Sequence, residues 1–411
     1  MITQSQRQLI DATLPTVEAN AVKITSCFYP LMFERYPEVL VYFNQTNQAK
    51  GTQRLALANA VVAYAKHLDA LGEISDTVRL ITQKHCSLGI LPEHYPIVGE
   101  CLLAAISEVL ADVINDEILD AWGAAYQQLA DILIGVEQNV YEENSQRLGG
   151  WKGEQTFELI KKTQESDVIT SFLLQPKDHS GAIDFTPGQY ITLVHSLNGQ
   201  TLRRNYSLSA APGKNTLQIS VKREEGGVLS NYLHDELKVG GELTLTAPCG
   251  DFTLKSNAKP LVLVTAGVGI TPALSMLNAA VDEHLVEGRE IHFIHCARNG
   301  DSHAFADEVK KITENNKGIS NTFIYSHPST ADLNGESGHA HDFGFLTEQH
   351  FSKHLKQDSD VECYVLGPKP FMQTALQLAA DFGIPQQQTH FEFFGPKQEL
   401  SIERKKEEVA A

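Results

Sequence analysis

The sequence predicts three consecutive domains: an all-α domain, an antiparallel β-barrel and a doubly wound α/β domain. Residues 1–147 carry apolar residues every three or four positions, as helices do. Residues 151–255 are short β-rich runs separated by Gly, Pro and Asn turns, as in antiparallel barrels. Residues 259–398 alternate apolar strands with helices, and residues 399–411 form a charged tail.

The helical domain contains one histidine in an unusual place. In "LITQKHCSLGILPEHY", His85 shares the apolar stripe of a helix with Val78. A histidine there is either a core side chain bonded to a carbonyl group or a ligand, and the spacing alone does not choose. Between helices, Pro15, Pro30 and Pro37 are expected to act as starts and stops.

The later domains contain turns that suit phosphate groups. "PLVLVTAG" fits a parallel strand buried on both faces, and the glycines of "AGVGITP" after it let backbone N–H groups approach a pyrophosphate. A tight packing turn has the same pattern. In the barrel, "RRNYSL" and "VKREEGGVLSNYLH" combine arginine, aromatic residues and a Gly-Gly-x-x-Ser turn, which a flavin and its diphosphate require. Taken singly, each is more often an ordinary strand or turn.

The composition excludes several classes of protein. The net charge of -18 argues against nucleic acid and anionic lipid as partners. The sequence has neither an export signal nor a run of apolar residues long enough for membrane insertion. The scattered cysteines offer no spacing for an iron–sulfur cluster or structural zinc. We expect an acidic, cytoplasmic, monomeric protein.

The motif order in residues 155–396 resembles the ferredoxin–NADP reductase-like flavoproteins: R-x-Y-S, Gly-Gly-x-x-Ser, G-x-G-x-T-P, a late Gly-Pro and "FEFFGP". The resemblance implies FAD in the barrel and NADH or NADPH in the α/β domain. The FAD contacts that it implies are Tyr190, Arg204, Asn205, Tyr206, Ser207, Gly227 and Ser230, with Phe393, Phe394, Gly395 and Pro396 covering the flavin. The dinucleotide contacts are Gly267, Val268, Gly269, Ile270, Thr271 and Pro272. Leu366 replaces the Cys usual before the late Gly-Pro, and we expect activity to survive because hydride transfer depends on alignment.

The helical domain offers a place for the electron acceptor. Gln53, Leu57 and Tyr64 fall on one face of a helix, opposite the later helix that carries His85, and Phe43 lies at the preceding corner. A haem pocket holds its macrocycle between two helices of this kind. Here the chain resembles a globin, and the whole chain is similar to the flavohaemoglobin family in "FNQTNQ", "QKH", "HYPIVGE", "AWGAAY" and "VKREEGG".

That resemblance assigns roles around a haem b. His85 would be the proximal iron ligand, with a hydrogen bond from its ring to Glu137 that Tyr95 joins. Tyr29 and Gln53 would be distal residues, and Phe43 and Leu57 would pack against the ring. Lys84 would lie where the haem edge meets the flavin domain.

The resemblance also implies an activity, nitric oxide dioxygenation: ferrous haem binds O2, the complex reacts with NO to give nitrate, and FAD returns the electron from NAD(P)H. A lipid can also enter an apolar haem pocket. Two alternatives stay open: a haem-based O2 or NO sensor controlling the reductase, and an NAD(P)H-dependent flavin, ferric or peroxide reductase. The choice between NADH and NADPH is open as well, because Arg298 and Asn299 can face a ribose phosphate or solvent.

Overall fold

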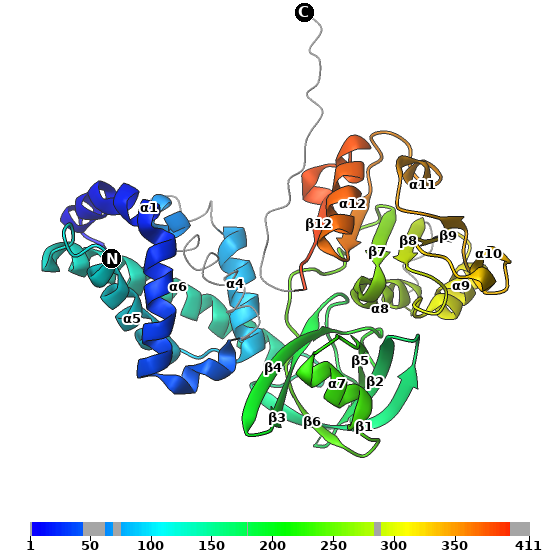
Figure 1. The fold of residues 1–411 in the computed structure, drawn as a ribbon, viewed down its shortest axis with the longest axis horizontal. Coiled ribbons are helices and arrows are strands. Elements are labelled where there is room, and N and C mark those ends of the chain that lie inside the picture. Colours follow the sequence, from blue (N-terminus) through cyan, green and yellow to red (C-terminus); the bar gives the residue numbers. More distant parts are fainter. Residues whose placement is uncertain (1, 44–61, 69–74, 179, 283–288, 395–411) are drawn as a thin grey trace, which may run out of the picture.

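The computed structural model of the 411-residue chain describes residues 2–43, 62–68, 75–178, 180–282 and 289–394. Figure 1 shows three bodies: a helical lobe, a barrel below, and a lobe of strands and helices beside it. The fold class predicted from the sequence is confirmed. Within the described ranges, no helix has the length and apolar character needed to cross a membrane.

The helical lobe packs long helices around one apolar core. Its elements are α1 (Gln4–Arg35), the 3-10 helix η1 (Pro37–Tyr42), α4 (Ser75–Leu88), α5 (His94–Val109) and α6 (Asp116–Gln146). α1 packs on α5 and α6, and α4 packs on α6. Ile10, Phe28 and Trp122 are each at most 3% exposed in this core. Helix α4, which carries His85, is therefore held against α6.

Two of the expected helix stops are wrong. Pro15 and Pro30 lie inside the continuous helix α1, whereas Pro37 does begin the next element. A proline inside a helix removes one backbone hydrogen bond and costs about 3 kcal/mol. The long buried face of α1, which includes Ile10, Val17 and Phe28, offsets that cost because tertiary packing overrides local propensity.

The second body is an antiparallel half-barrel. Its strands are β1 (Glu154–Gln164), β2 (Ile169–Pro176), β3 (Tyr190–Leu197), β4 (Gln200–Ser207), β5 (Leu217–Lys222) and β6 (Glu242–Thr246), in the sheet order β4-β3-β6-β1-β2-β5. Helix α7 (Val228–Asp235) follows β5, as the Gly-Gly-x-x-Ser turn predicts. The Nζ of Lys162 donates to the carbonyl oxygens of Leu233 and His234 at 2.8 and 2.6 Å, which satisfies the end of α7. The end of α7 is thereby tied to β1, the strand that carries Lys162.

The third body is a parallel sheet with helices on both faces. Its strands are β7 (Leu261–Ala266), β8 (Ile291–Ala297), β9 (Ile319–Tyr325), β10 (Asp342–Phe343), β11 (Glu362–Leu366) and β12 (Thr389–Phe391), in the order β10-β9-β8-β7-β11-β12. Helices α8 (Ile270–Asp282) and α9 (Ala306–Asn315) cover one face, and α11 (Glu348–Ser352) and α12 (Lys369–Asp381) cover the other. The short helix α10 (Thr330–Leu333) follows β9. The chain order reverses between β7 and β11, which is where such sheets bind ligands.

Candidate functional site

A hydrogen-bonded triad of a half-buried histidine and two buried residues links three elements of the helical lobe. His85 of α4 places its Nδ1 2.7 Å from the Oε1 of Glu137 on α6 and 3.1 Å from the hydroxyl of Tyr95 on α5. The Tyr95 hydroxyl donates to the same carboxylate oxygen at 2.6 Å. These are the contacts that the sequence predicts for His85, Tyr95 and Glu137.

The triad leaves one ring nitrogen of His85 available. A carboxylate only accepts, so the Nδ1 of His85 carries the proton and its Nε2 carries the lone pair. Glu137 is 2% exposed, and burial together with the Glu137 charge raises the pKa of Tyr95, which therefore remains a donor. Among the described residues, the Nε2 of His85 has no hydrogen-bond partner. This is how metal-binding histidines are oriented.

Aromatic residues of α1 and η1 gather on another side of the lobe. The ring of Tyr29 is 4% exposed and lies 5.8 Å from Phe43, edge to face. Phe33 lies 5.2 Å from Phe43. Gln53 and Leu57, the other residues predicted on this side, lie outside the described residues.

An apolar cavity of about 290 Å³ adjoins α4 and α6. Its lining includes Tyr64, Val78, Leu129 and Ile132. Among the described residues, the Tyr64 hydroxyl is buried without a hydrogen-bond partner, and burial raises its pKa to about 12. The cavity lies along the two helices that carry His85 and Glu137, and the unpaired phenol indicates that a group completes this region when bound. His85, on α4, offers at its Nε2 the lone pair that a haem iron requires.

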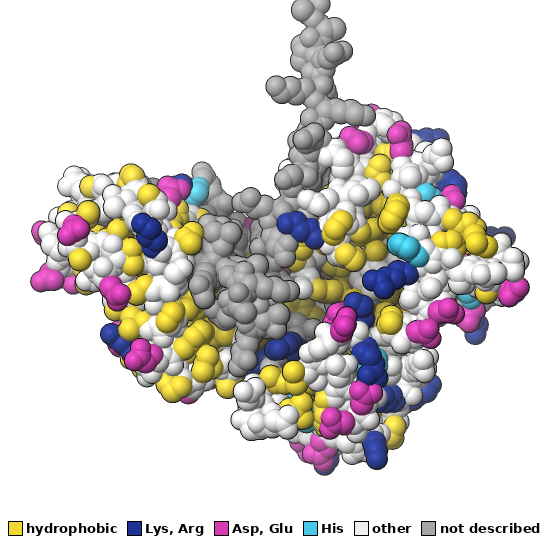
Figure 2. All heavy atoms as spheres, in the orientation of Figure 1, with side chains coloured by type: hydrophobic (Ala, Val, Ile, Leu, Met, Phe, Trp, Pro, Cys, Tyr) yellow, Lys and Arg dark blue, Asp and Glu magenta, His cyan; other side chains and the backbone are white. Residues whose placement is uncertain are grey.

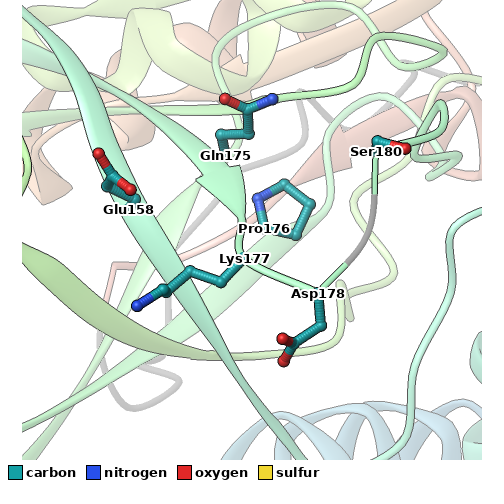
Figure 3. Close-up of a pocket in the computed structure, with 6 residues that line it drawn as sticks. All are labelled: Glu158, Gln175, Pro176, Lys177, Asp178 and Ser180. Carbon is teal, nitrogen blue, oxygen red and sulfur yellow. The ribbon is translucent and has the colours of Figure 1, made fainter.

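A larger hollow, of about 470 Å³, lies on the barrel. Figure 3 shows its lining: Glu158, Gln175, Pro176, Lys177, Asp178 and Ser180. Lys177 pairs with Glu242, and none of the predicted site residues lines the hollow. Charged and open to solvent, it differs from the mostly apolar sites that hold cofactors.

The barrel forms hydrogen bonds with the end of α4 that carries His85. The Thr246 hydroxyl donates to the Ser87 carbonyl oxygen at 2.9 Å, and Gly250 N–H donates to the Gln83 side-chain oxygen at 2.8 Å. A guanidinium nitrogen of Arg203 donates to the Leu88 carbonyl oxygen at 3.1 Å. These bonds satisfy the last carbonyl groups of the helix and fix the helical lobe to the barrel.

Three charged or polar side chains meet at this junction. The Nζ of Lys84 lies 5.7 Å from the ring centroid of Tyr190, which is 8% exposed beside Cys86 and Cys249. Loss of solvation raises the pKa of Glu392 to about 7, and the Lys84 charge opposes the rise. Loss of solvation also lowers the pKa of Lys84, against the charge of Glu392. Sequence reasoning missed Glu392, although a lone carboxylate inside "FEFFGP" was a signal.

The predicted FAD residues lie along β3, β4 and the start of α7. Arg204 donates to the carbonyl oxygen of Arg203 at 2.8 Å, and burial raises the pKa of Tyr206. Gly227 is the N-cap of α7, where an added Cβ would lie 2.5 Å from the Ser230 hydroxyl. The unpaired N–H groups at this helix start suit a diphosphate.

The other predicted FAD contacts are more dispersed. Ser207 is 6% exposed at the end of β4, and Asn205 donates to the Ser87 hydroxyl across the junction at 3.4 Å. Phe393 packs against the α/β core, whereas Phe394 is 55% exposed. Gly395 and Pro396 lie outside the described residues, as does the 399–411 tail.

The predicted dinucleotide turn lies at the switch point of the parallel sheet. Gly267 adopts φ +54°, and an added Cβ on Gly269 would lie 2.4 Å from the Leu366 carbonyl oxygen. Val268 completes the turn, and Ile270, Thr271 and Pro272 begin α8, where Thr271 donates to the Val268 carbonyl oxygen at 3.0 Å. The turn brings the ends of β7 and β11 so close that only glycine fits, which leaves its N–H groups open to a phosphate.

Comparison with known proteins gives three family matches in chain order. Residues 26–133 match the globin family, residues 156–254 the oxidoreductase FAD-binding domain, and residues 263–377 the oxidoreductase NAD-binding domain. A flavohemoprotein of Pseudomonas aeruginosa is 49% identical over 397 residues, which cover 96% of this chain and 98% of that protein. The chain belongs to the flavohemoprotein family. A more distant flavohemoprotein, from Rhodopirellula baltica, is 42% identical over 97% of the chain and 99% of its own length.

Solved structures of flavohemoproteins agree with the fold. A flavohemoglobin from Malassezia yamatoensis, solved with bound FAD and heme, superposes with a TM-score of 0.83 and 25% identity, covering 96% of this chain and all of that one. The FAD/NAD-binding domain of a nitric oxide dioxygenase from Vibrio cholerae has a TM-score of 0.53 and 30% identity, over 59% of this chain and 99% of that domain.

Proposed function

We propose that this flavohemoprotein is an NAD(P)H-dependent nitric oxide dioxygenase that converts NO and O2 to nitrate. The observation that carries the proposal is the triad of His85, Tyr95 and Glu137, fixed on a helix that the FAD-type barrel grips at its end. An electron source and a ligand site are thus built into one rigid junction. Full-length similarity to flavohemoproteins supports the same assignment.

Each cofactor would supply one kind of chemistry when bound. NAD(P)H would supply a hydride, FAD would accept two electrons and pass them on one at a time, and haem iron would bind O2. His85 would hold the iron through its Nε2, since its Nδ1 donates to Glu137. The Glu137 carboxylate accepts the Nδ1 proton and directs electron density toward Nε2, and Tyr95 keeps that carboxylate in place. On the other side, the phenol of Tyr29 would donate to a ligand that gains negative charge, together with Gln53.

The chain also arranges the route between donor and acceptor. Gly267 and Gly269 would receive the dinucleotide diphosphate beside β7, and Arg204 and the start of α7 would hold that of FAD. Tyr190 lies on the barrel strand that faces Lys84, the residue next to the ligand His85. The proposed flavin contact Tyr190 and the proposed iron ligand His85 are therefore linked through neighbouring residues of α4.

Three further properties belong to the proposal. All six cysteines are free thiols, which suits a cytoplasmic protein. The mostly apolar lining of the cavity beside Tyr64 also suits an acyl chain, so a lipid can share the haem pocket. We expect the chain to act as a monomer, because one chain supplies every element of the junction.

The test is a mass balance on protein loaded with haem and FAD. In air-saturated buffer with NADH and with NADPH, NO should disappear catalytically, nitrate should accumulate in equal amount, and NAD(P)H oxidation should rise with added NO. A sensor would change flavin turnover without consuming NO, and a plain reductase would oxidise NAD(P)H at a rate independent of NO. Either result would exclude dioxygenation.

A further inference from the structure

An arginine of the barrel lies against the helical lobe with one of its nitrogens unused within the described part of the chain. Arg203 on β4 is not part of the R-x-Y-S motif, which begins at Arg204. Its side chain is only 10% exposed, and its Nε is buried without a hydrogen-bond partner among the described residues. A buried donor on a charged group is costly when it makes no hydrogen bond, so we expect an acceptor at this position.

The other parts of the Arg203 guanidinium have partners. Its two terminal nitrogens donate to the Leu88 carbonyl oxygen at 3.1 Å and to the Oε1 of Glu154 at 2.6 Å. Its central carbon lies 5.1 Å from the ring centroid of Tyr42, and that ring lies 4.7 Å from the ring of His94. Contacts on three sides fix the guanidinium, so the direction of its Nε–H group is fixed as well.

These contacts place the guanidinium between the two elements that are expected to enclose the haem. Leu88 is three residues after His85, less than one turn further along α4. Tyr42 directly precedes Phe43, which we predict to pack against the haem ring. An iron held by the Nε2 of His85 would bring one edge of the macrocycle between the end of α4 and η1, and Arg203 contacts both elements.

The edge of a haem offers the acceptor that Arg203 lacks. Haem b carries two propionate carboxylates on one edge of an otherwise apolar macrocycle. A carboxylate in apolar surroundings is costly unless a cation pairs with it. The core of the helical lobe contains side chains such as Phe28 and Trp122, and Figure 2 shows hydrophobic side chains where that lobe borders the barrel. The propionate edge is therefore expected to face Arg203, whose planar guanidinium suits a carboxylate.

Two other cations near this place already have anionic partners. The Nε of Arg79 donates to Asp251 at 2.8 Å. Lys84 is buried beside the charge of Glu392. A propionate would therefore find its N–H donor on Arg203 without displacing an existing ion pair.

We propose that the Nε of Arg203 binds a haem propionate, so that the barrel takes part in holding the haem. The haem is then bound by two domains, with its iron on His85 of α4 and its carboxylate on Arg203 of β4. Binding of haem and docking of the helical lobe on the barrel favour each other, because such coupling is reciprocal. This inference rests on the haem site of the proposed function and not on the reaction of NO.

The experiment measures the rate at which FAD-loaded protein releases its haem to an excess of apomyoglobin, followed at the Soret band. Wild type and Arg203→Met are each loaded with protohaem or with haem dimethyl ester, whose esterified propionates carry no charge. Wild type should release the ester at least about tenfold faster than protohaem, since a charge-assisted hydrogen bond is worth about that factor or more. Arg203→Met should release protohaem at least about tenfold faster than wild type does, whereas release of the ester should differ by less than about threefold between the two proteins.

Arg147→Met is the matched control, because Arg147 also joins the helical lobe to the barrel, where it donates to the Thr186 hydroxyl at 3.1 Å. It should change neither release rate by more than about twofold, and FAD content should be equal in all proteins. Three results would overturn the proposal: equal acceleration of both haems in Arg203→Met, unchanged release of protohaem, or loss of FAD together with haem. Protein that shows the expected rates but consumes no NO would support this proposal and refute only the dioxygenase assignment.

Discussion

His85 in the helical lobe and the buried pair of His295 and His303 in the α/β lobe have opposite surroundings. In the helical lobe, His85 donates to the carboxylate of Glu137 and keeps its other nitrogen without a partner among the described residues. In the α/β lobe, His295 and His303 stack at 4.7 Å, and their Nδ1 atoms lie near the hydroxyls of Thr265 and Tyr325. Burial lowers the pKa of His295 to about 3 and that of His303 well below its usual value.

The difference separates a ligand from a core residue. A carboxylate partner fixes the tautomer of His85 and raises the electron density at its free nitrogen, as a metal ligand requires. Hydroxyl partners and stacked rings keep His295 on β8 and His303 in the following loop neutral, and neither ring has a carboxylate partner among the contacts of the described residues. Position on an apolar stripe does not distinguish the two cases, whereas the partner of Nδ1 does.

Replacing His85 should have the largest effect on this comparison. His85→Ala removes the only iron ligand in the proposal, so haem binding and NO consumption should fall to background. Reduction of an artificial dye by the flavin should stay within about twofold, because the reductase sites lie in other domains. His94→Gln is the matched control, since His94 bonds to its own turn at Leu91 and should keep haem. Equal loss of NO consumption and dye reduction in His85→Ala would show that the centres are not separable.

The next largest effect should come from lowering the pH, which should destabilise the α/β lobe through His295 and His303. Above pH 6.5 they are neutral in both states and the free energy of unfolding has its full value. Below pH 6.5 the unfolded chain binds protons that folded His295 and His303 cannot, so stability should fall by about 1.4 kcal/mol per pH unit for each. Hydrogen exchange, corrected for intrinsic rates, should show protection lost first in β7, β8 and β9. Equal loss in α1 and α5 would refute a specific role for these histidines.

Glu137→Gln should reduce activity less than loss of His85. An amide accepts the Nδ1 proton but carries no charge, so haem should bind while NO consumption falls by about ten- to one-hundredfold. The iron–histidine stretching frequency, measured by resonance Raman, should fall as well. Glu142→Gln is the control, because Glu142 is exposed on the same helix. An unchanged frequency in Glu137→Gln would mean that the carboxylate does not act on the iron.

Tyr95→Phe should have the smallest effect. It removes one donor to Glu137 but leaves the contact between His85 and Glu137, so NO consumption should fall only about three- to tenfold. The iron–histidine frequency should shift in the same direction as in Glu137→Gln, by less. A shift in the opposite direction would contradict the positioning role of Tyr95.

Local pattern and order of motifs were enough to predict the fold class, whereas the contacts of His85 were predicted only with the family resemblance. Helical spacing placed Glu137 near the apolar stripe, and an unpaired carboxylate there needs a partner. Pro15 and Pro30 misled because packing of α1 outweighs a local rule. The hydrogen bonds between the barrel and the end of α4 could not be predicted. They depend on how the two domains dock, which no local sequence pattern encodes.

The most direct test of the account is the visible spectrum of the purified, cofactor-loaded chain before and after anaerobic addition of NADPH or NADH. The account predicts a Soret band together with flavin absorption, and a shift of the haem to its ferrous form once the nucleotide is added. That result would show both centres present and connected through the junction of α4 and the barrel. Flavin absorption alone, even after haem is supplied, would contradict it and make His85 a core residue like His295.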